Sequence, residues 1–270
     1  MSTQIELGSV QETLLLPLWG RAVESKKDRP LLDDKKAVSI IENIKYDFTK
    51  ISSKVSKLSM ASWIARSIFF DDAIKSFIKD FPKATVVNIG CGLDTTFDRI
   101  DNGKIQWIDL DLPDVIKLRR QYIAESERRQ FIDKSVFDPS WMVGINDLNG
   151  ILLLFAGVLY YFEENKIKEL FSSIGKAFSP VDILFDYSSK RGIEVANKQV
   201  IKKGGMDEAA NLRWGLDSLK ELETWGMKIS ILEDMPMFKD HQKRYPWKKR
   251  IGMKISDGLK IMSLAHIRIG

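Results

Sequence analysis

The chain has one cysteine and two histidines among its 270 residues. A single cysteine, Cys91, excludes an internal disulfide and a cysteine-rich metal site, and it fits a reducing compartment. With only His241 and His266, imidazole ligands for a metal ion are also scarce. The sequence therefore predicts chemistry that needs no bound metal.

Long apolar runs are also missing. The most apolar stretch, Ile151 to Val158, is far shorter than the roughly 20 residues that a membrane-spanning helix requires. The N-terminus lacks the basic and apolar regions of a signal peptide, and we expect a cytoplasmic protein without a membrane partner. Hydrophobic residues make up 44% and charged residues 29%, which is typical of a globular protein, and the length favours one domain.

Negative charge is in the minority, since the formal net charge is +5. Residues 239–254 contain a basic cluster interrupted by aromatic side chains, a composition that also occurs in nucleic-acid-binding proteins. Lysine-rich loops are more often solvated surface than a groove that follows phosphates. We therefore expect no nucleic-acid partner.

The hydrophobic pattern changes period near residue 81. Residues 11–81 have helical spacing and predict an N-terminal helical cap, 1–81, on a core, 82–270, within a single domain. Apolar and β-branched runs in the core predict seven strands, at 84–89, 105–110, 130–136, 150–155, 181–185, 227–232 and 259–269.

Helical patterns separate several of these strands. Residues 113–126 and 163–178 predict helices, so the alternation favours a doubly wound, Rossmann-like, mainly parallel α/β sheet. The last two strands predict an antiparallel hairpin at the sheet edge, with little room for a full helix between them. The polar segment 190–214 is a candidate lid over the site.

The first predicted strand ends in Gly90-Cys91-Gly92. In an open parallel sheet, ligands bind beyond the carboxyl ends of the strands, and glycines there let the backbone approach a ligand closely. A glycine pair alone is weak evidence, because strand-turn-helix packing also uses it. The third glycine of the dinucleotide fingerprint would fall at Thr95 and is missing, which counts against a nicotinamide enzyme.

Two aspartates stand at the end of the second predicted strand. Asp109 and Asp111 lie about 19 residues beyond Gly92, where a carboxylate can accept hydrogen bonds from both hydroxyls of a ribose. Asp111, directly before Leu112 and Pro113, is the favoured candidate. The alternative is that both aspartates only cap the next helix.

Taken together, these motifs resemble the leucine carboxyl methyltransferase family, whose bacterial members include polyketide O-methyltransferases of the tetracenomycin type. The resemblance covers most of the chain and is most specific in three motifs that occur in order. They are Asn-Ile-Gly-Cys-Gly-Leu-Asp-Thr at 88–95, Asp-Leu-Asp-Leu-Pro at 109–113 and Gly-Val-Leu-Tyr-Tyr-Phe at 157–162, preceded by weaker matches at 20–25, 31–37 and 64–67.

The resemblance implies S-adenosylmethionine as the methyl donor and assigns several residues to it. Arg66 matches the arginine that binds the donor carboxylate, Gly90 matches the glycine whose backbone approaches the donor, and Asp111 matches the ribose aspartate. Arg21 aligns loosely with a basic residue at the donor carboxylate, and a plain surface role is an equal alternative.

Further positions follow from the same resemblance, with two departures. Ser135 and Val136 fall where the family contacts the adenine, with Ser135 in place of a common acidic residue. Ala156 replaces a glutamate that normally faces the donor, and Thr96 replaces an arginine. These departures weaken donor binding or mark a subgroup.

Methyl transfer from a sulfonium is an in-line displacement, so alignment and exclusion of water matter more than a covalent residue. Tyr160, Tyr161, Tyr187 and Arg191 follow the two strands expected beside the donor, and Tyr161 is the first candidate for an acceptor contact, with apolar packing as the alternative. His241 is a possible base, although an idle surface histidine is the better interpretation.

The favoured function is methyl transfer from S-adenosylmethionine to a carboxylate or hydroxyl of a small molecule, by a monomer or homodimer. A carboxyl methyltransferase acting on a protein or peptide terminus and a catalytically inactive donor-binding protein remain alternatives. A nucleic-acid amino-methyltransferase is disfavoured, because residues 156–160 lack the Asx-Pro-Pro-aromatic turn that flanks a flipped base.

Overall fold

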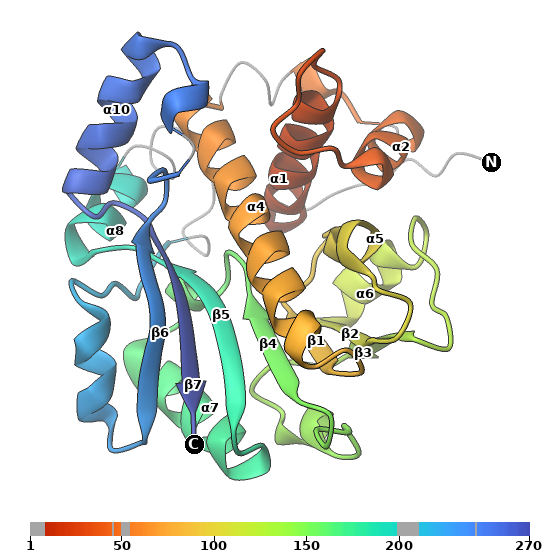
Figure 1. The fold of residues 1–270 in the computed structure, drawn as a ribbon. Coiled ribbons are helices and arrows are strands. Elements are labelled where there is room, and N and C mark those ends of the chain that lie inside the picture. The colour runs from red at the N-terminus through yellow and green to blue at the C-terminus, as the bar shows by residue number, and fades with distance from the viewer. Residues whose placement is uncertain (1–8, 45, 50–54, 199–210, 241) are drawn as a thin grey trace.

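A computed structural model describes residues 9–44, 46–49, 55–198, 211–240 and 242–270. Seven strands form one sheet in the order β3-β2-β1-β4-β5-β7-β6, as Figure 1 shows. Their bounds are β1 Thr85–Ile89, β2 Gln106–Asp111, β3 Arg129–Asp133, β4 Ile151–Phe155, β5 Val181–Tyr187, β6 Ile229–Pro236 and β7 Ser263–Ile269. The strands β1 to β5 run parallel, and β7 is antiparallel to both β5 and β6. The predicted doubly wound sheet with a C-terminal edge hairpin is confirmed.

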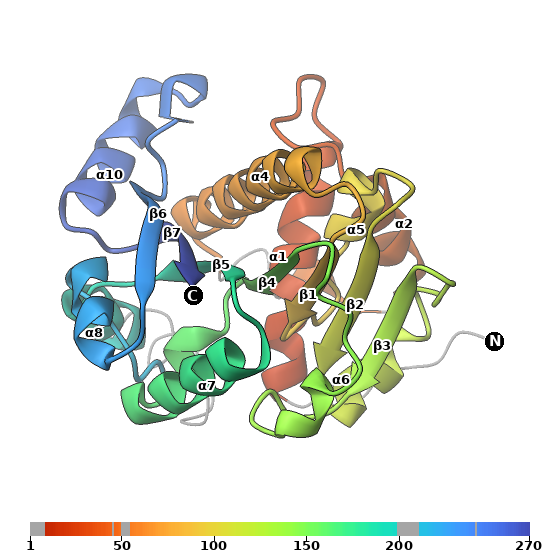
Figure 2. The same ribbon diagram turned by 60° about the horizontal axis from the view of Figure 1, so that its bottom comes forward.

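Helices cover both faces of this sheet, and Figure 2 shows α4 on one side with α6 and α7 on the other. The α-helices are α1 Ser9–Ser25, α2 Lys35–Asn43, α4 Lys57–Asp80, α5 Thr96–Ile100, α6 Pro113–Arg119, α7 Glu164–Ala177, α8 Lys190–Ala196 and α10 Trp247–Gly258. Short 3-10 helices are η1 Pro139–Met142, η2 Leu159–Tyr161, η5 Leu219–Trp225 and η6 Gln242–Arg244.

The central strands are buried on both faces because their sequences are almost wholly apolar. All five residues of β1 and all five of β4 are buried. Successive side chains of a strand point to opposite faces, so Val86 and Leu152 pack in the cluster of α4, whereas Val87 and Leu153 pack in the cluster of α7. The helix α4 begins at Lys57 after Ser56, whose side chain accepts a hydrogen bond from the Ser59 amide.

The N-terminal helices α1 and α2 pack against the turn that follows β1. Leu15, Leu18 and Ile40 are buried in one cluster with Cys91 and Leu93 of that turn. The predicted helical character of the N-terminal region is confirmed, and this region lies directly beside the candidate site.

Two sequence-based predictions about helices were wrong. A full helix, α10, lies between β6 and β7, where we expected little room for one. Three apolar residues of this helix, Trp247, Ile251 and Ile255, are spaced as on one helix face, but they are exposed among lysines, and the structure buries only Met253 and Ser256 of it. The helix after β2 ends at Arg119 rather than at residue 126, and residues 120–128 form turns and a short bridge.

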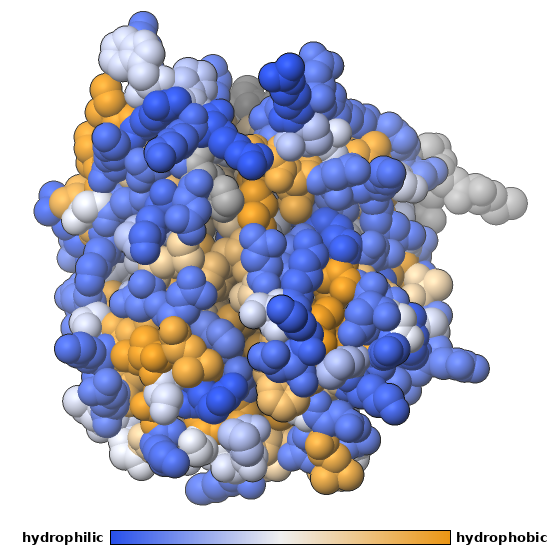
Figure 3. All heavy atoms as spheres, in the orientation of Figure 1, coloured by the Kyte–Doolittle hydropathy of each residue, from blue (hydrophilic) through white to orange (hydrophobic). Residues whose placement is uncertain are grey.

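No helix in the described part of the chain combines the length and apolarity needed to cross a membrane. In Figure 3 the face that carries α4 and the hairpin is largely hydrophilic, with apolar atoms gathered near its centre.

Candidate active site

The strand order reverses beside β1, which has β2 on one side and β4 on the other. This is the position where open α/β sheets bind ligands. Gly90 ends β1 with a φ of 64°, and a Cβ built there would lie 2.6 Å from Cγ2 of Val158, in the turn after β4. Only glycine fits this position, because the two turns are in direct contact.

Asp111 closes the same turn from the end of β2. One carboxylate oxygen accepts a hydrogen bond from the Gly92 amide at 2.8 Å, and the other accepts one from the Leu112 amide at 2.8 Å. A carboxylate has about four acceptor positions, so it can accept further bonds from a ligand. Burial raises the pKa of Asp111 despite these amide donors. The side chain does not cap α6, whose N-cap is Leu112 without a side-chain bond.

The neighbouring Asp109 has a different role. Its side chain is fully buried and forms ion pairs with Arg119 at 2.8 Å and with Arg129 at 2.9 Å. Arg119 also donates to the Gly92 carbonyl at 2.8 Å, so Asp109 supports the glycine turn through Arg119. Of the two predicted aspartates, only Asp109 is paired with arginines, whereas Asp111 accepts from backbone amides and is partly exposed.

Arg66 lies at the second turn, which follows β4. Its Nη1 donates to Oδ2 of Asp186 at 2.8 Å, and a Cβ on Gly157 would approach the same nitrogen to 2.7 Å. The Gly157 amide donates to Oδ1 of Asp186 at 2.6 Å. Burial acts to lower the pKa of Arg66, but the Asp186 and Tyr160 side chains raise it above its usual value, so the guanidinium stays charged.

Arg66 is thus buried. From its position in the sequence alone, without the family resemblance, it would have been predicted to be a surface arginine of α4. Sequence reasoning missed Asp186. A charged residue inside the apolar strand β5 is the signal that could have identified it, since a buried carboxylate needs a partner.

Arg21 belongs to a buried cluster centred on Asp34. Oδ2 of Asp34 accepts from Arg21 at 2.9 Å, from Arg99 at 2.7 Å and from the Thr95 hydroxyl at 2.6 Å. Arg21 also donates to the Leu93 carbonyl at 3.3 Å, which ties α1 to the glycine turn. Its predicted contact with the donor stays a prediction.

Arg99 supplies a guanidinium one helical turn beyond Thr96, the position that departs from the family pattern. It donates to the Thr96 hydroxyl at 2.9 Å and forms two hydrogen bonds with Asp71. Burial acts to raise the pKa of Asp94, but Arg21 and Arg99 outweigh it and lower that pKa to about 2. The end of the turn therefore stays negatively charged at neutral pH.

The other predicted donor contacts surround these two turns. Ser135 and Val136 follow β3; the Ser135 hydroxyl accepts from the Phe137 amide, and the Val136 carbonyl accepts from the Trp141 indole. Ala156 directly follows β4 and is partly buried. Their contacts with a donor stay predictions.

The candidate acceptor residues are dispersed. The Tyr161 side chain is 37% exposed and its ring lies 5.1 Å from that of Tyr160. Tyr187 is fully buried and donates to Asp234, whereas Arg191 is exposed on α8. Burial and the nearby Asp186 raise the pKa of Tyr160, so its hydroxyl stays protonated.

Neither histidine is placed at these turns by the described residues. His266 pairs with Asp182 on β5 at 2.9 Å, and His241 lies outside the described residues. Most of the predicted lid, 199–210, lies outside them as well. Its described end contacts η2, since the Arg213 and Trp214 amides donate to the Tyr160 carbonyl.

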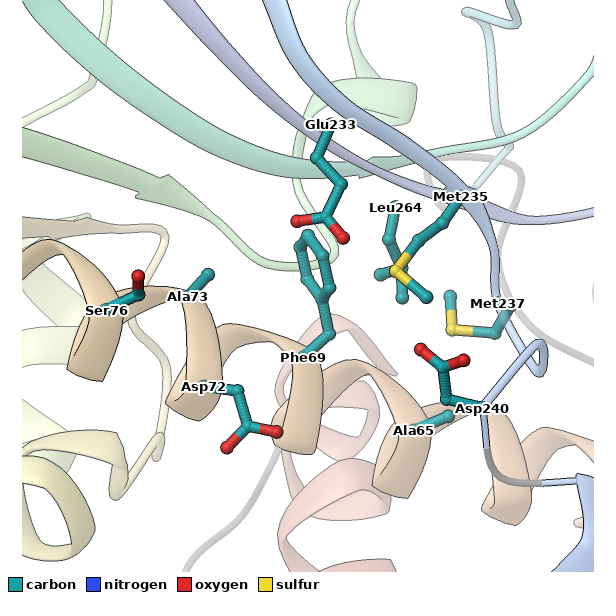
Figure 4. Close-up of a pocket in the computed structure, with 10 residues that line it drawn as sticks. All are labelled: Ala65, Phe69, Asp72, Ala73, Ser76, Glu233, Met235, Met237, Asp240 and Leu264. Carbon is teal, nitrogen blue, oxygen red and sulfur yellow. The ribbon is translucent and has the colours of Figure 1, made fainter.

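A pocket of ≈ 260 Å³ lies between α4 and the β6–β7 hairpin. Figure 4 shows Phe69 and Ala65 of α4 facing Met235 and Leu264 of the hairpin. Leu264 pairs with Asp186 in the sheet register, so this pocket neighbours the Arg66 cluster on the face covered by α4. None of its lining residues belongs to the glycine turn. Among the described residues, no group of three histidine, cysteine or acidic side chains is arranged to hold a metal ion.

Comparison with known proteins connects this geometry to a family. The leucine carboxyl methyltransferase family model matches residues 15–136, which include α4, the glycine turn and Asp111. The chain is an S-adenosylmethionine-dependent methyltransferase that is similar to the leucine carboxyl methyltransferase family over these residues. The predicted resemblance, fold class and methyl donor are confirmed.

Two curated relatives cover most of the chain. The tetracenomycin polyketide synthesis O-methyltransferase TcmP of Streptomyces glaucescens is 28% identical over 83% of this chain and 82% of its own length. The S-adenosyl-L-methionine-dependent methyltransferase dpfgK of Gibberella zeae is 27% identical over 96% of this chain and 93% of its own length.

A solved structure from Thermobifida fusca has the same fold. It superposes with a TM-score of 0.61 at 13% identity and covers 94% of this methyltransferase and 93% of its own chain.

The residues present fit the methyl donor. The contact between Gly90 and Val158 leaves no room for a side chain at residue 90, where the strand order reverses. A side chain at residue 157 would likewise collide with Arg66. A guanidinium suits a carboxylate and an aspartate suits a ribose diol, and Arg66 and Asp111 supply these two groups at the two turns.

Proposed function

We propose that this methyltransferase transfers the methyl group of S-adenosylmethionine to a carboxylate or hydroxyl oxygen of a small molecule. The observation that carries the proposal is the junction of the two turns, where Gly90 meets Val158 between Asp111 and Arg66. The likeness to TcmP, an O-methyltransferase of polyketide synthesis by name, supports oxygen as the acceptor atom.

In this proposal the donor lies across the carboxyl ends of β4, β1, β2 and β3. Arg66 binds the donor carboxylate, and the backbone of Gly90 and Gly92 follows the donor closely. Asp111 accepts from the ribose hydroxyls with the lone pairs that the Gly92 and Leu112 amides leave available.

The remaining predicted donor contacts complete the same path. Ser135 and Val136 contact the adenine, Ala156 faces the donor without a charged group, and Arg21 lies near the donor carboxylate. Residues 1–81 serve as the helical cap of a single domain and 82–270 as its core, with 190–214 as the lid.

When bound, S-adenosylmethionine supplies a methyl group attached to a sulfonium, which is electrophilic. The chain's own task is to align an acceptor oxygen and to keep water away from it. Tyr161 is exposed next to the second turn and is proposed to contact the acceptor. Tyr160, held protonated beside Arg66, can donate a hydrogen bond but does not act as a base at neutral pH.

The chain is proposed to act as a monomer or homodimer in the cytoplasm, without a nucleic-acid or membrane partner. The support is the buried single cysteine and the mixed, mainly solvated charge of its surface.

The experiment is a calorimetric titration with S-adenosylmethionine and, separately, with NAD. We expect micromolar binding of the first and none of the second. A panel of small carboxylic acids, phenols and carboxyl-terminal peptides then serves as acceptors, with methylated product measured by mass spectrometry. Turnover confined to the peptides, or donor binding without any turnover, would contradict the proposal.

A further inference from the structure

Asp186 is a buried carboxylate that joins α4, the turn after β4 and strand β5. Its side chain is fully buried; one oxygen accepts from Arg66 and the other from the Gly157 amide. The two bonds connect segments separated by 120 residues of sequence in one case and 29 in the other. Neither the family resemblance nor the comparisons assigns it a role.

The bond to Arg66 fixes how that guanidinium is presented. Arginine has five N–H donors in a rigid plane, so holding Nη1 against Asp186 sets the direction in which the other donors point. Two parallel bonds to a carboxylate require this kind of fixed orientation. Without Asp186, Arg66 would keep its hydrogen bond with Tyr160 but lose its ion pair, and donor binding would have to restrict a more mobile side chain.

The bond to Gly157 fixes the turn itself. Gly157 has a φ of 79°, and its Cα faces both Arg66 and the Tyr160 hydroxyl closely enough that any side chain would collide with them. Through its two oxygens, Asp186 therefore holds the arginine and the turn in one relative position.

We propose that Asp186 is a positioning residue for the methionine end of the donor, and that it acts by setting the orientation of Arg66. This inference rests on the proposed function, since it needs the donor carboxylate at Arg66. Asp186 is too deeply buried to touch the donor in this structure and acts through Arg66 and the Gly157 backbone.

The loss of the Asp186 charge affects ligand binding separately from the loss of its orienting hydrogen bond. Removing a negative charge beside Arg66 would favour a carboxylate ligand, but the methionine end of the donor carries an ammonium group as well, and that group loses the same interaction. The two effects oppose each other, so the orientation of Arg66 decides the outcome.

The test compares two ligands that differ only at that end. S-adenosylhomocysteine has the adenosine and the amino-acid portion, whereas 5′-methylthioadenosine lacks the carboxylate and the ammonium. For Asp186→Asn we expect affinity for S-adenosylhomocysteine to fall at least tenfold, and affinity for 5′-methylthioadenosine to stay within twofold of wild type. Calorimetry supplies both dissociation constants.

Asp182→Asn is the matched control. Asp182 lies on the same strand, is also buried and pairs with Arg268 and His266, away from both turns. We expect the Asp182→Asn variant to bind either ligand with the wild-type affinity. Equal losses of both ligands in Asp186→Asn would mean a general structural role and overturn the proposal, as would unchanged affinity for S-adenosylhomocysteine.

A second variant covers a failure to fold. Should Asp186→Asn yield no folded protein, Asp186→Glu keeps the charge but moves the carboxylate, and the same selective loss of S-adenosylhomocysteine is expected. Equal losses there would again overturn the inference. If wild-type protein binds neither ligand, the proposed function itself fails, which is distinguishable from a failure confined to the variants.

Discussion

Replacing Gly90 with alanine tests the contact between the two turns at the strand switch. The new Cβ would lie 2.6 Å from Cγ2 and 3.3 Å from Cγ1 of Val158. Rotation of the valine offers little relief, because its Cβ also lies 3.6 Å from the new atom and a β-branched side chain is stiff at χ1. The backbone or the turn after β4 must therefore shift.

The cost has two separable parts. A non-glycine residue in the left-handed region costs about 1–2 kcal/mol, which applies because φ at Gly90 is 64°. Overpacking against Val158 adds about 1–3 kcal/mol. Gly103→Ala isolates the first part, since Gly103 has a φ of 76° but nothing within 4 Å of a new Cβ.

Chemical denaturation of both variants measures the free energy of unfolding. We expect Gly90→Ala to be less stable than Gly103→Ala by about 1–3 kcal/mol, the overpacking part alone. Adding Val158→Ala to Gly90→Ala should recover most of that difference, and the double-mutant cycle should show a favourable coupling. Equal stability of the two glycine variants, or no coupling with Val158, would refute the contact.

Three further predictions concern the site. Asp111→Ala should weaken S-adenosylmethionine binding by roughly 10- to 100-fold in calorimetry, because ribose hydroxyls lose a charged acceptor; unchanged affinity would place the ribose elsewhere. Asp94 has a pKa lowered from 3.8 to about 2, so its stabilisation is present above pH 3.8 and is lost as pH falls towards 2. Asp94→Asn should therefore cost about 2 kcal/mol of unfolding free energy at pH 7 and about half of that at pH 3; an equal cost at both would contradict the prediction. Tyr161→Phe should raise KM for the acceptor while the dissociation constant of the donor stays constant, and a changed donor affinity would argue against an acceptor contact.

The sheet and the glycine turn could be predicted because their signals are local. Apolar strands such as β1 and β4, buried along their whole length, stand out in the sequence, and a glycine that needs positive φ follows the first of them directly. Asp111 was identifiable by its distance from the turn and its place at the end of a strand. Such patterns need no knowledge of which distant segments meet.

The parts that were missed depend on long-range pairing. Nothing near Asp186 in the sequence indicates that Arg66 is its partner, and nothing near Arg99 indicates Asp34. For these ion pairs the decisive contacts are made in three dimensions, and hydrophobic period carries no information about them. The helix α10 was missed for another reason: Trp247, Ile251 and Ile255 have helical spacing, but the lysines between them were interpreted as a solvated loop.

Three groups of buried ion pairs involve residues next to the two turns, and stability alone does not account for that placement. Asp34, Asp109 and Asp186 each accept from at least one arginine of another element. Removing such charges from water costs about as much as their attraction returns, so apolar packing would stabilise the fold equally well. Apolar side chains, however, fix no hydrogen-bonding direction. Because Asp109 holds the glycine turn through Arg119, and Asp186 holds the second turn directly, the gain is a fixed relative position of the two turns between which the methyl donor is proposed to bind.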